Sequence, residues 1–118
     1  PVHRIGGGST ENLALKPREA ALDPPGFSVL QGGTPSEAAT AMKQALPKAT
    51  QLHEQAKTVG TATAKGVHDA GFGLKVTPSR KLPSHVRVTH PKGGKGFSPE
   101  NRAKLSQQFK DTKVEEEQ

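Results

Sequence analysis

Residues 72–90 read FGLKVTPSRKLPSHVRVTH. Apolar side chains alternate with polar ones in both halves of this stretch, at Phe72, Leu74 and Val76 and then at Val86 and Val88. Such alternation is typical of a strand that is buried on one face only. Because residues 78–83 can form a connecting loop, we predict that 72–77 and 84–90 pair as an antiparallel hairpin.

Two more short strands are predicted near the N-terminus, over residues 2–5 and 27–30. A glycine run follows each of them, where the backbone can turn sharply or approach a ligand closely. Three prolines interrupt the segment between the two strands. We therefore expect a long ordered loop there, with one helical turn near residues 11–15.

The strongest helix signal begins at Thr34. This residue can cap a helix, Pro35 suits the first helical position, and Glu37 completes a capping box. Pro47 is expected to end the helix. The predicted apolar face consists of Ala38, Ala41, Met42, Ala45 and Leu46.

Three further helices are expected, over residues 50–59, over residues 61–70 and after Ser98. Gly60 and Gly71 would end the first two. The last helix would take Ser98 as its N-cap, and it would bury Leu105 and Phe109 one turn apart.

Together these elements predict an α+β fold, a small antiparallel sheet of short strands with three to four helices. We expect a single domain over residues 1–112, followed by an acidic, disordered tail over residues 113–118. Only 31% of the residues are hydrophobic and 3% are aromatic, so the core must be thin. Help from a bound partner would be a natural source of stability.

The formal charge of +6 surrounds the chain with a positive field. A field of this sign favours nucleic acid, an anionic membrane or an acidic protein as a partner. The absence of cysteine excludes disulfides, thiolate nucleophiles and the common structural zinc sites. We expect neither a metal site nor a membrane span, because no run approaches the ~20 apolar residues of a membrane helix. The chain opens with Pro1, which suggests a piece of a longer protein.

One predicted strand places His85, Arg87 and Thr89 on the face opposite its buried valines, and His90, Lys92 and Lys95 follow it. This set could cleave a phosphodiester without metal. One group would take a proton from the attacking hydroxyl, another would protonate the leaving oxygen, and a cation would stabilise the charged phosphate. The other interpretation is the solvated outer face of a hairpin, which carries such residues routinely.

A second set consists of Arg4 and the glycines that follow it. An arginine at the end of a strand, beside the free amides of Gly6 and Gly7, is suited to hold a pyrophosphate. The alternative is an ordinary surface charge. The pattern does not match the dinucleotide fingerprint, because no strong helix opens on these glycines.

With these residues in view, the stretch VHRIGGGSTENLALKPREAALDPPGFSVL resembles the start of ADP-ribosyltransferase-type toxin domains. Such domains end polymorphic bacterial effectors, including rearrangement-hotspot proteins. Arg4 and Gly26-Phe27-Ser28 match the order of their first strand and of the later Gly, apolar, Ser or Thr strand. The resemblance implies that NAD is the substrate, that Arg4 grips its phosphates, and that Ser28 braces the strand beside the nicotinamide ribose.

The resemblance also implies a carboxylate near the breaking glycosidic bond, and here the sequence departs from the family pattern. Residues 115–117 are glutamates but fall in the predicted tail. Glu54 and Glu100 could take the place of the catalytic glutamate, but neither lies in the sequence motif of the family. Three hypotheses therefore stay open. The first is a transferase of ADP-ribose, the second a metal-independent ribonuclease centred on His85, Arg87 and His90, and the third a non-catalytic basic module that binds nucleic acid or an acidic protein.

For the transferase, we expect a secreted antibacterial effector domain, such as a type VI secretion effector, delivered into the cytoplasm of a target cell. The acceptor would be a component of the translation machinery or nucleic acid. A producer of such a toxin needs a cognate immunity protein. The charge of +6 predicts an acidic surface on that protein.

Overall fold

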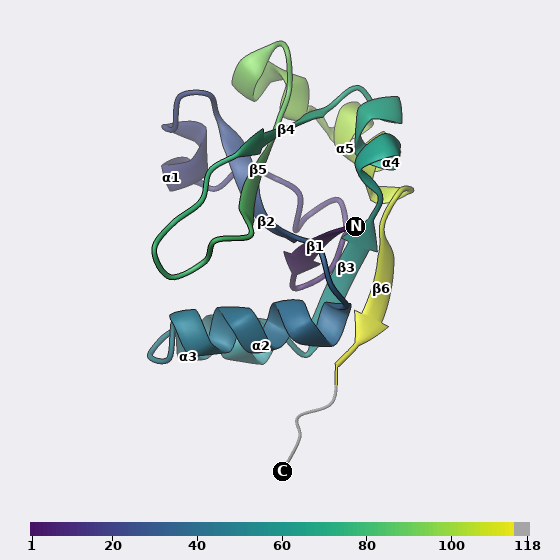
Figure 1. Ribbon diagram of the computed structural model, residues 1–118. Coiled ribbons are helices and arrows are strands. Elements are labelled where there is room, and N and C mark those ends of the chain that lie inside the picture. The colour runs from purple at the N-terminus through teal and green to yellow at the C-terminus, as the bar shows by residue number, and fades with distance from the viewer. Residues whose placement is uncertain (115–118) are drawn as a thin grey trace.

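The sheet is larger than expected, although the α+β class is confirmed. The computed structural model describes residues 1–114 and contains a six-stranded antiparallel sheet in the order β4-β5-β2-β1-β3-β6 (Figure 1). The strands are β1 (Val2–Ile5), β2 (Gly26–Gln31), β3 (Thr58–Ala62), β4 (Gly73–Val76), β5 (His85–Thr89) and β6 (Lys110–Lys113). The helices are α1 (Pro17–Ala20), α2 (Pro35–Ala45), α3 (Thr50–Gln55), α4 (Ala64–Asp69) and α5 (Pro99–Ser106), with the 3-10 turn η1 (Gly93–Phe97).

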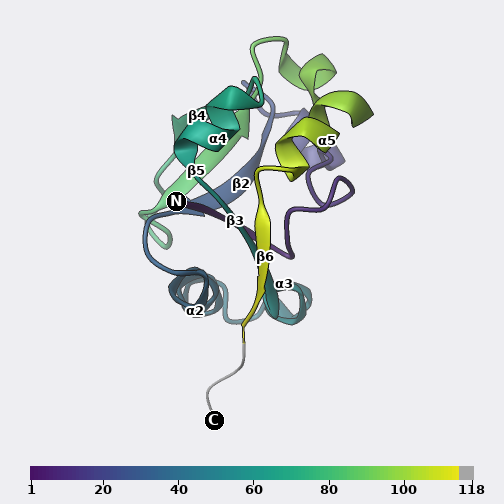
Figure 2. The same ribbon diagram turned by 90° about the vertical axis from the view of Figure 1, so that its right-hand side faces the viewer.

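Helices cover parts of both faces of the sheet. In Figures 1 and 2, α2 and α3 lie together at one end, and α4 and α5 lie at the other. Two apolar clusters follow from this arrangement. The larger one joins Phe27 and Val88 of the sheet to Val67 of α4 and Leu105 of α5. The smaller one packs α2 and α3 against β2 and β3.

The predicted helix starts are confirmed by their caps. The Thr34 hydroxyl accepts a hydrogen bond from the Glu37 amide at 3.1 Å, and the Glu37 carboxylate accepts one from the Thr34 amide at 3.1 Å. The Ser98 hydroxyl accepts one from the Asn101 amide at 3.2 Å. Helix α2 ends at Ala45, before Pro47, and it buries Ala38, Ala39 and Met42.

The predicted hairpin is confirmed as well. Strands β4 and β5 are antiparallel, with Leu74 opposite Val88 and Val76 opposite Val86. Along β5 the two valines are buried, while His85, Arg87 and Thr89 are half-buried on the other face. The alternation in the sequence therefore identified the two faces of β5 correctly.

The prediction of helices through residues 58–62 was wrong, because this segment is strand β3. It pairs with β1 over four residues, and Gly60 lies opposite Arg4. A Cβ at Gly60 would stand 2.5 Å from the Gly8 amide nitrogen, so the glycine permits the close approach of the turn after β1. Val59 and Ala62 are buried by the two clusters.

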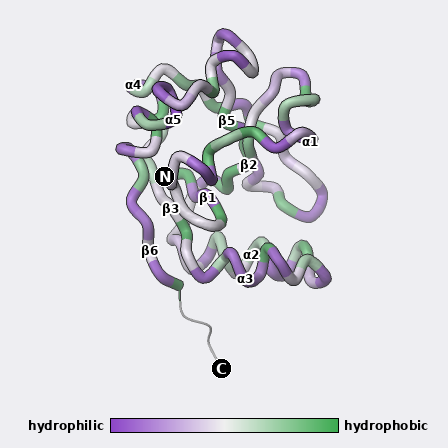
Figure 3. Tube along the Cα trace, turned by 180° about the vertical axis from the view of Figure 1, so that it is seen from behind, coloured by the Kyte–Doolittle hydropathy of each residue, from purple (hydrophilic) through white to green (hydrophobic). Residues whose placement is uncertain are grey.

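Strand β6 was not predicted either. Its four residues are exposed and it is hydrophilic along its length (Figure 3), so it lacks the apolar signal of a strand. Backbone pairing with β3 holds it, and the Asp111 carboxylate accepts a hydrogen bond from the Gly8 amide at 2.8 Å. Lys113, which the sequence placed in the tail, is the last residue of β6. The glutamates of the predicted tail lie outside the described residues.

Candidate functional site

A cavity of about 670 Å³ lies where β1 and β2 separate. Its apolar wall comes from β2, α2, α3 and the β4–β5 loop, and includes Leu30, Met42, Leu46, Leu52 and Leu82. Its polar lining includes Arg4, Glu19, Ser28 and His85. An apolar cavity of this size with a few convergent polar groups is typical of a small-molecule site.

The separation of the strands follows from their pairing. Strand β1 pairs with β3 along all four residues, but it pairs with β2 only at Val2 and His3. Beyond His3 the two strands part, although β2 stays paired with β5 from Gly26 to Leu30. The backbone carbonyl of Ser28 then needs another partner, and the side chain of Arg4 supplies it.

The Arg4 guanidinium fills this gap between the strands. Its Nη1 donates to the Ser28 carbonyl at 2.9 Å, and its Nε and Nη2 donate to the Asn12 carbonyl at 3.2 and 2.9 Å. The guanidinium carbon lies 4.8 Å from the centre of the Phe27 ring. Burial lowers the pKa of Arg4, and the nearby Glu19 carboxylate opposes this shift. Three of the five guanidinium N–H groups donate to these two carbonyls, which leaves two that bind no carbonyl, and Nη1 also forms an ion pair with Glu19 Oε2 at 3.9 Å.

The Ser28 hydroxyl and the His85 ring form a second pair in the cavity. Ser28 is an exposed position of β2, and its Oγ lies 2.8 Å from His85 Nε2. The other ring nitrogen of His85 lies 2.8 Å from the Thr77 carbonyl oxygen. The structure thus brings together Arg4, Ser28 and His85, which the sequence assigned to two different hypotheses.

The cavity also contains a carboxylate that the sequence analysis missed. Glu19 Oε2 lies 3.9 Å from Arg4 Nη1, and Glu19 Oε1 accepts a hydrogen bond from the Lys16 amide at 3.0 Å. Pro17 at the first position of α1, with an acidic residue two positions later, is a helix-start signal that could have identified this segment. The other two candidate carboxylates lie elsewhere, since Glu54 of α3 pairs with Lys57 and Glu100 is on α5.

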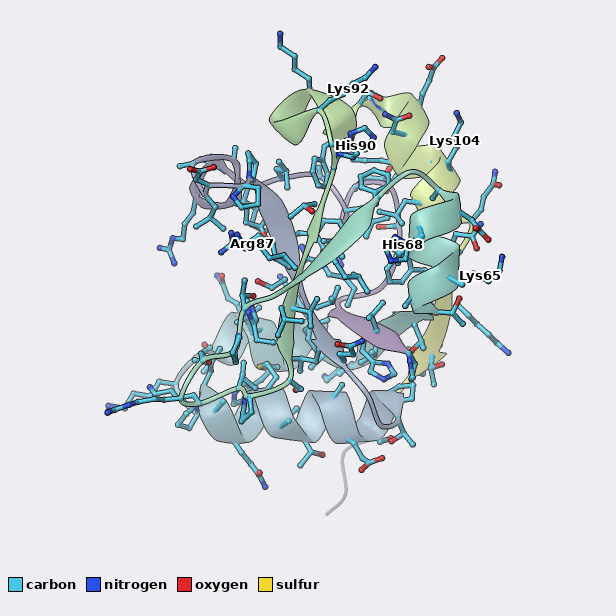
Figure 4. The ribbon with its side chains drawn as sticks, turned by 45° about the horizontal axis from the view of Figure 1, so that its top comes forward. Lys65, His68, Arg87, His90, Lys92 and Lys104 are labelled. Carbon is cyan, nitrogen blue, oxygen red and sulfur yellow. The ribbon has the colours of Figure 1, made fainter. Side chains whose placement is uncertain are left out.

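Two residues of the predicted ribonuclease site do not line this cavity. Arg87 Nη1 donates to the Pro24 carbonyl at 3.0 Å. His90 packs edge-on against Phe72, with ring centres 4.9 Å apart, and its Nδ1 accepts a hydrogen bond from the Lys92 amide. In Figure 4, His90 and Lys92 lie at the end of the molecule opposite α2. His85, Arg87 and His90 therefore do not converge on one site.

The glycines predicted to bind a cofactor form a turn beside the cavity and do not line it. The Gly6 amide donates to the Thr58 carbonyl at 2.8 Å, and the Gly7 amide donates to the Arg4 carbonyl at 3.2 Å. Both residues have positive φ, at 95° and 100°, as such a turn requires. Their amides are thus engaged within the protein and are not available to an anion.

Basic residues rim the cavity. Lys16 and Arg18 contribute to its lining, and Arg80 and Lys81 are exposed on the loop that supplies Leu82. An anionic ligand would be attracted to such a rim. Within residues 1–114, no three His, Asp or Glu side chains gather as a metal would require.

No protein-family model, curated protein or solved structure matches this chain. Within the part of the chain that the structure describes, no helix is long and apolar enough to cross a membrane.

Proposed function

We propose that this domain transfers ADP-ribose from NAD to an acceptor. The observation that carries the proposal is that Arg4, Ser28 and a carboxylate, Glu19, line one cavity. The resemblance of residues 2–30 to ADP-ribosyltransferase-type toxins predicts that Arg4 and Ser28 lie in one cavity together with a carboxylate. The volume of about 670 Å³ lies within the range of cavities that bind small molecules.

Each polar group then has a chemical task. The two N–H groups of Arg4 that bind no carbonyl would hold the pyrophosphate of NAD, helped by Lys16 and Arg18 at the rim. As the bond to nicotinamide breaks, the ribose acquires oxocarbenium character, and the Glu19 carboxylate would stabilise its positive charge. The leucine-rich wall offers an apolar surface to the flat nicotinamide or adenine ring.

The proposed activity suits a toxin. We propose a toxin domain of a secreted antibacterial effector that acts in the cytoplasm of a target cell, on a component of the translation machinery or on nucleic acid. The formal charge of +6 supports an anionic acceptor. A cognate immunity protein with an acidic surface would cover the basic rim of the cavity.

The direct test is incubation of the purified domain with labelled NAD and a bacterial lysate. Label is measured separately in protein and in RNA, together with RNA integrity. Glu19→Gln should reduce transfer strongly, while Glu54→Gln should not, because Glu54 is an exposed carboxylate that pairs with Lys57 outside the cavity.

The outcomes distinguish the three hypotheses. Label in protein or RNA that depends on Glu19 supports the transferase and identifies the acceptor class. Intact NAD with shortened RNA would contradict the transferase and favour a ribonuclease. Intact NAD with intact RNA would leave a basic binding module.

A further inference from the structure

The Ser28 hydroxyl lies in the geometry of an activated nucleophile. Its Oγ is 2.8 Å from His85 Nε2, and His85 Nδ1 is 2.8 Å from the Thr77 carbonyl oxygen. A hydroxyl, an imidazole and a group that orients the imidazole are the three parts of such a site. Here the third part is a backbone carbonyl.

The chemistry of the three groups fixes the direction of the proton. Two oxygens of Thr77 lie 2.8 Å from His85 Nδ1, the backbone carbonyl and the side-chain hydroxyl. A carbonyl oxygen can only accept a hydrogen bond, so it favours the tautomer of His85 with hydrogen on Nδ1, and the hydroxyl oxygen can accept from the same hydrogen. Nε2 then carries the lone pair and accepts the hydrogen of Ser28. The lone pair that would remove the hydroxyl proton is thus aimed at Ser28 Oγ.

The sheet holds this arrangement in place. Leu30 lies opposite His85 and Ser28 lies opposite Arg87, so Ser28 and His85 are diagonal neighbours on one face of β2 and β5. The Thr77 amide donates to the His85 carbonyl at 3.1 Å, which fixes the start of the loop beside the ring. Ser28 and His85 therefore sit on paired strands, and Thr77 directly follows β4.

From this geometry we propose that Ser28 is a nucleophile and that His85 is its general base. Applied to the proposed function, on which this step rests, the electrophile is the anomeric carbon of the nicotinamide ribose. The bond from Ser28 Oγ to that carbon forms, the carbon–nitrogen bond to nicotinamide breaks, and nicotinamide leaves with the bonding electrons. The Ser28 proton moves to His85 Nε2, and the Thr77 carbonyl stabilises the resulting imidazolium.

A reactive sulfonyl fluoride tests the nucleophile without NAD. Ser28 Oγ bonds to sulfur, fluoride leaves, the proton passes to His85, and peptide mass spectrometry measures the rate at each serine. Ser36, exposed on α2, is the internal control. We expect much faster labelling of Ser28, and His85→Gln should slow it by about a hundredfold, within the usual contribution of a general base. His68→Gln, at an exposed histidine of α4 that does not line the cavity, should leave the rate essentially unchanged.

Equal labelling of Ser28 and Ser36, or no loss of rate in His85→Gln, would overturn the proposal. The same protein is then incubated with NAD and quenched at short times. ADP-ribose on Ser28, absent in Ser28→Ala and reduced in His85→Gln, supports the covalent step. Release of nicotinamide with no adduct on Ser28 at any time would overturn that step and leave the transferase standing. No release of nicotinamide would contradict the transferase, and the sulfonyl fluoride result then decides on Ser28 alone.

Discussion

Replacement of Arg4 by methionine would test whether the guanidinium holds the separated strands β1 and β2. Methionine keeps an unbranched apolar stem of similar length but removes all donors to the Ser28 and Asn12 carbonyls. A hydrogen bond from a charged donor contributes about 1.5–3 kcal/mol, so two carbonyls that lose such donors cost about 3–6 kcal/mol. Arg4 is 7% exposed, and removing a buried charge recovers part of that cost. We therefore expect the free energy of unfolding to fall by about 2–4 kcal/mol.

Urea unfolding, followed by circular dichroism, measures this change. With a urea dependence of about 1–3 kcal/mol per molar, the midpoint should fall by about 1–3 M. Arg87→Met is the matched control, because Arg87 is half-buried and donates to the Pro24 carbonyl at 3.0 Å. We expect it to cost about 1 kcal/mol, below the range for a buried charged donor, because water can replace the donor at this half-buried position. An Arg4→Met midpoint equal to that of Arg87→Met would refute the reasoning.

Three other substitutions test parts of the fold. Thr34→Ala should lower the free energy of unfolding by about 1 kcal/mol in urea titrations, because the hydrogen bond from the Glu37 amide to the Thr34 hydroxyl is lost. Gly60→Ala should cost about 1–3 kcal/mol, because its Cβ would meet backbone atoms at 2.5 Å, whereas Gly94→Ala, with open space around it, should be nearly neutral by the same measurement. Burial, followed by the charge of Lys92, lowers the pKa of His90 below its usual 6.5. As the pH falls below 6.5, His90 of the unfolded chain is therefore protonated before His90 of the folded protein, so the free energy of unfolding decreases in that range. Between pH 7 and pH 5, the midpoint temperature of thermal unfolding should therefore fall less for His90→Gln than for the wild type.

The elements that depend on neighbouring residues could be predicted from the sequence. The capped start of α2, the cap of α5 and the alternation along β5 are local patterns, and the structure contains each of them. Strand β3 could not be predicted in the same way, because its stability comes from pairing with β1, more than fifty residues earlier. Strand β6 has no apolar residue between Lys110 and Lys113, so its pairing leaves no signal in the sequence.

The candidate site shows the same limit. Arg4, Ser28 and His85 could be selected by residue type and position, but the sequence assigned them to different reactions. Only the register of β2 against β5 shows that Ser28 and His85 share a face. Glu19 was missed because it lies in a segment whose prolines indicated a loop, and its place beside Arg4 depends on tertiary packing.

The early parting of β1 from β2 constrains how this protein can change. Longer pairing between the two strands would give more backbone hydrogen bonds, and it would displace the Arg4 guanidinium from the Ser28 carbonyl that it now occupies. The space for a ligand and the rigidity of the central sheet therefore compete for the same few residues. Stabilised variants with a working cavity should carry their substitutions elsewhere, on α4, on α5 or along the exposed edge of β6.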